Sequence, residues 1–126
     1  MGITEASVIG RLSSMPLYTS DYRLEPWVGV LNDPNLHPDG REIVEICPID
    51  LHEVLSRPCI NTIPSASPFE GSDEIHLSPV FEIGDHLMFG ATAYVFMEFL
   101  EIIADILGCP LPQKVVSEYK WTDLLP

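Results

Sequence analysis

Residues 84–108, GDHLMFGATAYVFMEFLEIIADILG, contain the longest helical pattern and the densest apolar stretch in this sequence. Within them, Glu98, Glu101 and Asp105 recur at spacings of three and four, which groups their carboxylates on one side of a helix. Apolar residues, Phe99 among them, occupy most of the other positions. The pattern predicts a mostly buried helix with a narrow solvated stripe, against which the rest of the chain packs.

The ends of this helix are marked by residues with special backbone properties. Gly90 can begin the helix without a side-chain clash, Gly108 suits the left-handed residue that follows a helix, and Pro110 prevents continuation. We therefore expect a helix from about residue 90 to about residue 108. Its length is marginal for a membrane span and it contains three carboxylates, so we expect no membrane insertion.

Composition restricts the partners of the protein. The chain has 126 residues, which is enough for one globular core, and its 19 acidic residues outnumber 6 basic ones, with a formal net charge of −13. Phosphate contacts are normally made by Lys and Arg, so we expect no nucleic acid partner. An acidic surface suits divalent cations or a basic protein, and it is also typical of an ordinary soluble protein.

The cysteines and histidines form no recognisable chemical motif. Cys47, Cys59 and Cys109 match no zinc or redox spacing, which favours buried thiols in a reducing compartment. The four histidines lack the i, i+4 spacing of paired metal ligands. Because no basic segment followed by an apolar run opens the sequence, we expect a cytoplasmic protein.

The first half of the chain alternates β-type segments with turns. Residues 7–12 predict a short strand, and residues 22–31 predict a largely buried central strand that begins near an edge or bulge at Pro26. Residues 32–41 are rich in Pro, Asn and Asp and predict a loop. Residues 42–47, EIVEIC, predict a third strand.

A short helix and a hairpin are expected to follow. Asp50 caps a helix that runs to about Ser56 and is stopped by Pro58. Residues 59–73 are rich in Pro, Ser and Gly and predict an irregular surface excursion. Residues 75–83 then form a strand that turns tightly at Gly84 into residues 87–89.

The order of these elements predicts an α+β (mixed α/β) fold with one long C-terminal helix and one short helix. Residues 109–126 form a tail without helical periodicity, which either adds a strand or makes an intermolecular contact.

Four segments, taken in order, resemble the part of a Nudix hydrolase that follows the Nudix box, and are most similar to the coenzyme A diphosphatase branch. They are GRLSSMPLYTS (10–20), WVGVL (27–31), EIVEICPIDLHEVL (42–55) and MFGATAYVFMEFLEII (88–103). The last resembles that branch's W-G-x-T-A segment and final helix, with Phe89 in place of Trp. The resemblance covers about residues 2–107 and implies a partial Nudix-like sheet, as a domain over residues 1–108, with 109–126 as a tail.

The catalytic part of the family motif does not occur in this sequence. The motif G-x5-E-x7-R-E-Φ-x-E-E-x-G-Φ places glutamates on one helix, where they hold Mg²⁺ or Mn²⁺ against a diphosphate. Only its final Gly-Φ is matched, by Gly2 and Ile3. Glu42 and Glu45 are the remaining candidate metal ligands. They are three residues apart, so in a strand they face opposite sides and a shared metal would require a bulge or loop.

These features leave three functional hypotheses open. In the first, the chain is a truncated or degenerate Nudix-like protein that does not hydrolyse diphosphates on its own. In the second, it is part of a diphosphatase that acts on coenzyme A or another nucleoside diphosphate derivative, and the Nudix box is supplied elsewhere. The third hypothesis is an acidic, non-enzymatic interaction module. The missing half of the sheet predicts an uncovered edge, and hence a homo-oligomer or a complementing chain.

Overall fold

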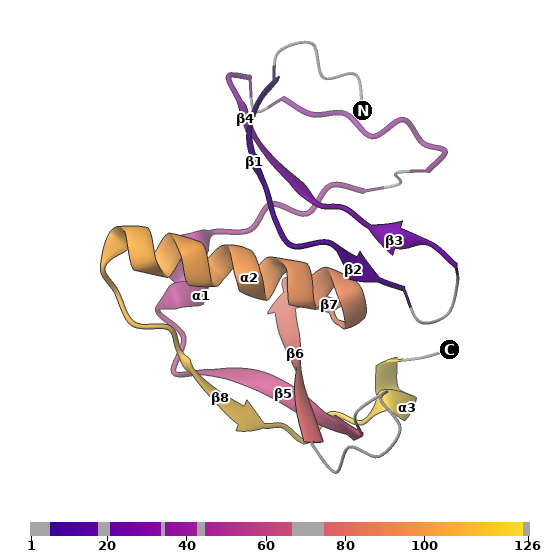
Figure 1. Cartoon of the computed structure of the whole chain (residues 1–126), viewed down its shortest axis with the longest axis vertical. Helices are drawn as coiled ribbons and strands as arrows, with labels where there is room; N and C mark the ends of the chain where they lie inside the picture. Colours follow the sequence, from indigo (N-terminus) through magenta and orange to yellow (C-terminus); the bar gives the residue numbers. More distant parts are fainter. Residues whose placement is uncertain (1–5, 18–20, 34, 43–44, 67–74, 125–126) are drawn as a thin grey trace. The chain divides into compact units, whose positions relative to one another are not determined.

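The computed structural model describes residues 6–17, 21–33, 35–42, 45–66 and 75–124 (Figure 1). The chain forms two compact units, residues 1–49 and 50–126. Strands and helices both contribute, which confirms the predicted α+β class. The elements, in order, are β1 (Ala6–Arg11), β2 (Met15–Pro16), β3 (Arg23–Leu24), β4 (Trp27–Leu31), α1 (Leu51–Leu55), β5 (Cys59–Ala66), β6 (Ile75–Ile83), β7 (His86–Met88), α2 (Gly90–Leu107), β8 (Gln113–Val116) and α3 (Trp121–Leu124).

The first unit is built from two short antiparallel ribbons. The strand predicted over residues 7–12 is confirmed as β1, which pairs with β4 through a bulge between Val8 and Gly10. The strand predicted over residues 22–31 is divided into β3 and β4, with Pro26 between them, because proline cannot donate to a ladder.

The prediction that residues 22–31 form a buried central strand is wrong. Among the described residues β4 pairs with β1 alone, and Trp27 and Val30 remain 60% and 48% exposed. Trp27 lies opposite Arg11, whose guanidinium carbon is 5.6 Å from the ring centroid. β-type residues favour strands at edges as well as in cores, so composition alone could not decide burial.

The strand predicted over residues 42–47 is also wrong for the residues that the structure describes. Glu42 lies in a bend and residues 45–47 have no regular structure, while residues 43–44 fall outside the described part of the chain. A strand needs a neighbour to pair with its backbone, and the alternation in EIVEIC carries no information about that neighbour.

The short helix of the second unit is confirmed at both ends. Asp50 is the N-cap of α1, and its carboxylate accepts hydrogen bonds from the backbone N–H groups of His52 (3.0 Å) and Glu53 (3.3 Å). Ser56 is the C-cap. The cap depends on contacts within three residues, which explains why the sequence predicts it well.

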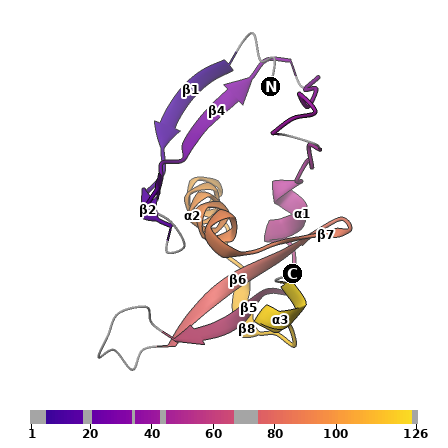
Figure 2. The ribbon, with the colours of Figure 1, turned by 90° about the vertical axis from the view of Figure 1, so that its right-hand side faces the viewer.

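A four-stranded mixed sheet with the order β7-β6-β5-β8 forms the body of the second unit. β6 is antiparallel to β5 and β7, whereas β8 runs parallel to β5 (Figure 2). The irregular excursion predicted over residues 59–73 is therefore wrong over β5, and residues 67–74 lie outside the described residues. Pro64 follows Thr62, the last β5 residue paired with β8, so its missing N–H removes no bond from that ladder.

The predicted hairpin and long helix are confirmed. Gly84 has φ +56° in the turn between β6 and β7. α2 begins at Gly90 and ends at Leu107, and Gly108 has φ +68°, the left-handed conformation that glycine adopts without strain. The backbone N–H groups of Gly108 and Cys109 donate to the carbonyl oxygens of Asp105 (3.2 Å) and Ala104 (3.0 Å).

The buried side of α2 is narrower than predicted. Its buried residues recur at spacings of four, three and four, and are Ala93, Met97, Leu100 and Ala104. Ile106 is 73% exposed and Phe99 is only half-buried, so the expected core position of Phe99 is corrected. Figures 1 and 2 show α2 against β6 with α1 beside it. Within the second unit, β6 and the short helix α1 pack against one side of α2. The sequence pattern shows which residues of the helix are apolar, but it does not show which of them the neighbouring elements cover.

The C-terminal tail adds a strand, one of the two alternatives predicted for it. β8 is joined to β5 by side chains as well as by the ladder: Thr62 Oγ1 donates to the Val115 carbonyl (2.8 Å) and Ser117 Oγ donates to the Thr62 carbonyl (2.9 Å). Thr62 is fully buried, and these bonds satisfy its polar atoms. No helix among the described residues is long and apolar enough to cross a membrane.

Candidate functional site

Glu42 and Glu45, the two predicted metal ligands, are exposed and lie outside helices and strands. The Nudix resemblance implies Mg²⁺ or Mn²⁺ held by glutamates on one helix, a rigid arrangement that brings several carboxylates to one side. Neither Glu42 nor Glu45 belongs to a described helix or strand, so the two residues do not reproduce that helical arrangement. We therefore derive no catalytic step through a metal ion at these residues.

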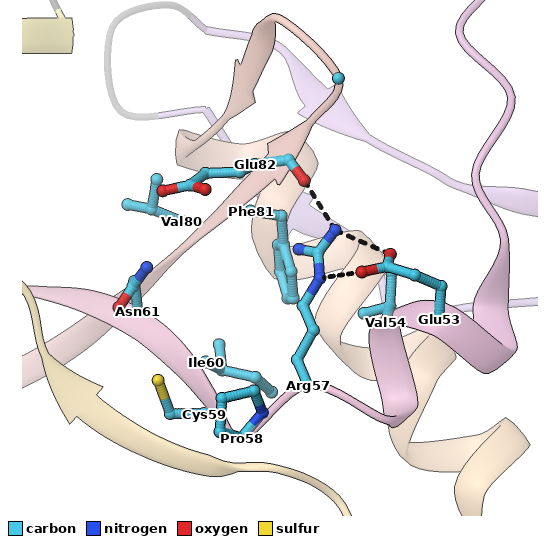
Figure 3. Close-up of a pocket in the computed structure, with 11 residues that line it drawn as sticks. Glu53, Val54, Arg57, Pro58, Cys59, Ile60, Asn61, Val80, Phe81 and Glu82 are labelled. Carbon is cyan, nitrogen blue, oxygen red and sulfur yellow. Dashed lines mark hydrogen bonds and ion pairs between the residues drawn. The ribbon is translucent and has the colours of Figure 1, made fainter.

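A pocket of about 390 Å³ lies entirely within the second unit (Figure 3). It is formed where the end of α1 meets the β5–β6 ladder. The residues that line it are Glu53, Val54, Arg57, Pro58, Cys59, Ile60, Asn61, Val80, Phe81, Glu82 and Gly84. The pocket thus combines an apolar base with charged and polar side chains from a helix and two strands.

The guanidinium of Arg57 is held in place by three hydrogen bonds (Figure 3). Nε and Nη2 donate to the two carboxylate oxygens of Glu53, each at 2.9 Å, and Nη2 also donates to the Glu82 backbone carbonyl at 2.8 Å. Glu53 precedes Arg57 by four residues, the spacing that brings two side chains together on a helix. Such a two-point pair restricts the guanidinium more than a single contact would.

The charges of this pair stabilise each other. The hydrogen bond from Arg57 holds the pKa of Glu53 below its usual range, and the same bond raises the pKa of Arg57. Glu82, on β6, has a second contact. The Tyr119 hydroxyl donates to a carboxylate oxygen of Glu82, and this hydrogen bond raises the pKa of Tyr119. The Tyr119 contact connects the segment after β8 to β6.

The lowered pKa of Glu53 predicts a pH dependence of stability. Because the folded pKa is depressed, the Glu53–Arg57 pair stabilises the fold above the unfolded pKa and loses this effect as the pH falls through the folded pKa. Glu53→Gln should therefore unfold more easily than the native chain near neutral pH. The difference between their urea midpoints should shrink as the pH is lowered below about 4.

Urea titrations at several pH values measure this difference directly. Glu101→Gln, which removes an exposed carboxylate from α2, is the matched control for the loss of one surface charge. A constant difference between Glu53→Gln and the native chain across the pH series would mean that the ion pair is not formed in solution.

Both carboxylates that line the pocket are already hydrogen-bonded within the protein. Glu53 accepts from Arg57, and Glu82 accepts from Tyr119. Cys59 also lines the pocket and is half-buried, as is Cys109, whereas Cys47 is exposed, so the predicted burial of the thiols is wrong for Cys47.

The sequence patterns do not predict this pocket. The Glu53–Arg57 spacing is a local signal that could have indicated an ion pair. Asn61 and Glu82, by contrast, are brought to the pocket by the register of β5 against β6, in which Asn61 lies opposite Val80. No sequence pattern specifies that register.

Comparisons with known proteins supply no assignment for this site. A scan of protein-family models, a search of curated proteins and a search of solved structures each found no match to the chain.

Proposed function

We propose that this chain is a Nudix-like scaffold that binds or assembles with other molecules and does not hydrolyse diphosphates on its own. The supporting observation is that the motif's REΦxEE glutamates do not occur in the 126 residues, while Glu42 and Glu45 are exposed and outside regular structure. Hydrolysis of this class requires carboxylates that position a divalent cation on the diphosphate.

The Nudix part of this proposal rests on the resemblance in sequence and on the elements that coincide with it. The segment resembling W-G-x-T-A, residues 89–93, lies at the junction of the β6–β7 hairpin and α2. The helix expected from the resemblance occupies Gly90–Leu107. Under this proposal the protein is cytoplasmic and works with a second copy of itself or with a complementing chain.

The first unit favours a second candidate function, that of one component of a divided diphosphatase. Among the described residues, β1 and β4 pair only with each other, and an isolated two-stranded ribbon is at best marginally stable in water. Val8, Ile9 and Trp27 are each at least 60% exposed on this ribbon. A polypeptide carrying the Nudix box would supply both the missing glutamates and apolar cover.

A diphosphatase assay tests the proposal. The purified chain, incubated with coenzyme A or ADP-ribose and with Mg²⁺ or Mn²⁺, should release no product above the blank. Glu42→Gln and Glu45→Gln should behave like the native chain. Sedimentation of the same samples identifies the oligomeric state to which each result applies.

Turnover by the native chain that is lost in Glu42→Gln or Glu45→Gln would contradict the proposal and would make these glutamates metal ligands. The divided-enzyme alternative has its own test. If the DNA immediately upstream encodes an REΦxEE segment, adding that polypeptide should produce metal-dependent turnover that neither component shows alone.

A further inference from the structure

The C-terminal half of α2 carries an exposed apolar row. Ile102 and Ile106 are 43% and 73% exposed, and their spacing of four residues brings them together on the helix surface. Half-buried Phe99 precedes Ile102 by three residues and extends the row. Single exposed apolar residues are ordinary on a protein surface, whereas adjoining ones form a patch of the kind that marks interaction sites.

This row points away from the side of α2 that is buried within the second unit. Leu100 and Ala104 belong to the buried side. Each residue of an α-helix turns by about 100°, so Ile102 and Ile106, two residues further on, point roughly 200° away from them. A helix is normally covered wherever its surface is apolar. The isoleucine row therefore has the composition of a covered surface but remains exposed.

An acidic row runs beside the apolar one. Glu101 and Asp105 are exposed, lie four residues apart, and each immediately precedes an isoleucine of the apolar row. The sequence of α2 contains no Lys, Arg or His, so the helix itself supplies no positive charge to offset them. In a chain of net charge −13, carboxylates along an apolar row favour a basic partner over an acidic one.

The position of Asp105 strengthens this preference. Asp105 lies in the last turn of α2, where the helix dipole is negative and a cation, not an anion, is stabilising. A positive charge from a partner would interact favourably with both the carboxylate and the end of the helix. The same partner could therefore compensate the exposed isoleucines and the negative charge beside them.

A second copy of this chain is a poorer match for the surface. Packing two α2 helices along their isoleucine rows would bring together two acidic rows and two chains that each have a net charge of −13. Like charges across an interface oppose association. An amphipathic helix with basic residues beside its apolar stripe provides apolar cover without this repulsion.

We propose that the C-terminal half of α2 docks a basic amphipathic helix of a partner protein. Apolar side chains of the partner cover Ile102 and Ile106, and its Lys or Arg side chains pair with Glu101 and Asp105. The proposal does not depend on the Nudix resemblance, and the outcome of the diphosphatase assay does not affect it.

Nuclear magnetic resonance titration of the full chain with a designed peptide tests the proposal. The probe is an acetylated, amidated peptide of leucine, alanine and lysine, with leucines at spacings of three and four and lysines beside them. We expect saturable shifts of the Ile102 and Ile106 methyl signals, and an affinity that falls as salt is added, because exposed charge pairs are screened. The indole N–H of Trp27, in the first unit, is the internal control.

A second peptide tests the contribution of charge. It has glutamate in place of every lysine and keeps the leucine pattern. Because its charges repel Glu101 and Asp105, it should bind at least about tenfold more weakly than the lysine peptide at low salt.

Two substitutions locate the surface. Ile106→Gln should weaken binding of the lysine peptide about tenfold, because apolar burial is lost. Asp105→Asn should weaken it about threefold and reduce its salt dependence, as expected for one exposed charge pair. Ile75→Gln, at a residue 70% exposed on β6, and Asp85→Asn, at an exposed residue of the β6–β7 turn, are the matched controls and should bind like the native chain.

Several results would overturn the proposal. They are the absence of saturable shifts with the lysine peptide, equal affinity for the glutamate peptide, native-like binding by Ile106→Gln, and saturation at Trp27 in place of the α2 signals. Shifts of Ile102 and Ile106 that depend on the concentration of the chain alone would assign the surface to a second copy and would also overturn it. A two-dimensional amide spectrum of each variant confirms that it is folded, as expected for substitutions at exposed residues.

Discussion

Leu100→Ala is expected to lower the free energy of unfolding by about 2–5 kcal/mol. Leu100 is fully buried on α2, between Met97 and Ala104 on the same buried side of the helix. Truncation removes the transfer free energy of the side chain and leaves a cavity that the surrounding residues fill only in part. Urea denaturation followed by far-ultraviolet circular dichroism measures the change.

Ile106→Ala is the matched control, because it removes an aliphatic side chain of similar size from the same helix. Ile106 is 73% exposed, and its truncation should change the free energy of unfolding by no more than about 0.5 kcal/mol. Similar losses for the two variants would show that the buried side of α2 is not the side that carries Leu100.

Phe81→Ala is expected to lower the free energy of unfolding by about 3–5 kcal/mol. Phe81 is 2% exposed on β6 and meets Phe96 of α2 edge to face, with ring centroids 4.9 Å apart and planes at 84°. The substitution thus removes a large buried volume and an aromatic contact between the sheet and the long helix. Thermal or urea unfolding measures the loss.

A double-mutant cycle isolates the contact between the two rings. Phe81→Ala, Phe96→Ala and the double variant should reveal a coupling free energy of about 0.5–1.5 kcal/mol. Strict additivity would mean that the rings do not interact in solution. Phe81→Leu, which retains much of the buried volume, should cost less than Phe81→Ala.

Sequence patterns predict those elements whose ends depend on neighbouring residues. Asp50 caps α1 by accepting hydrogen bonds from the backbone N–H groups two and three residues ahead. Gly84 adopts the positive φ of the β6–β7 turn, and Gly108 ends α2. Each signal acts within about one helical turn or one tight turn, so it can be recognised without knowing the rest of the fold.

Which strands are central depends on long-range pairing in the folded protein. The Pro- and Ser-containing segment over residues 59–66 becomes β5, which lies between β6 and β8, whereas the β-rich segment over residues 27–31 becomes the exposed strand β4. Strand pairing joins residues far apart in the chain, such as Thr62 and Val116, and outweighs local propensity.

The residues of the candidate site likewise divide into those that a local sequence pattern predicts and those that only the fold brings together. The Glu53–Arg57 pair is encoded by a spacing of four residues across the end of α1. Asn61, Glu82 and Tyr119 meet it only because β5, β6 and the segment after β8 are neighbours in the folded unit. Local geometry depends on short segments of the sequence. The position of a strand depends on the strands and helices that pack against it. The pocket could therefore not be predicted from the sequence.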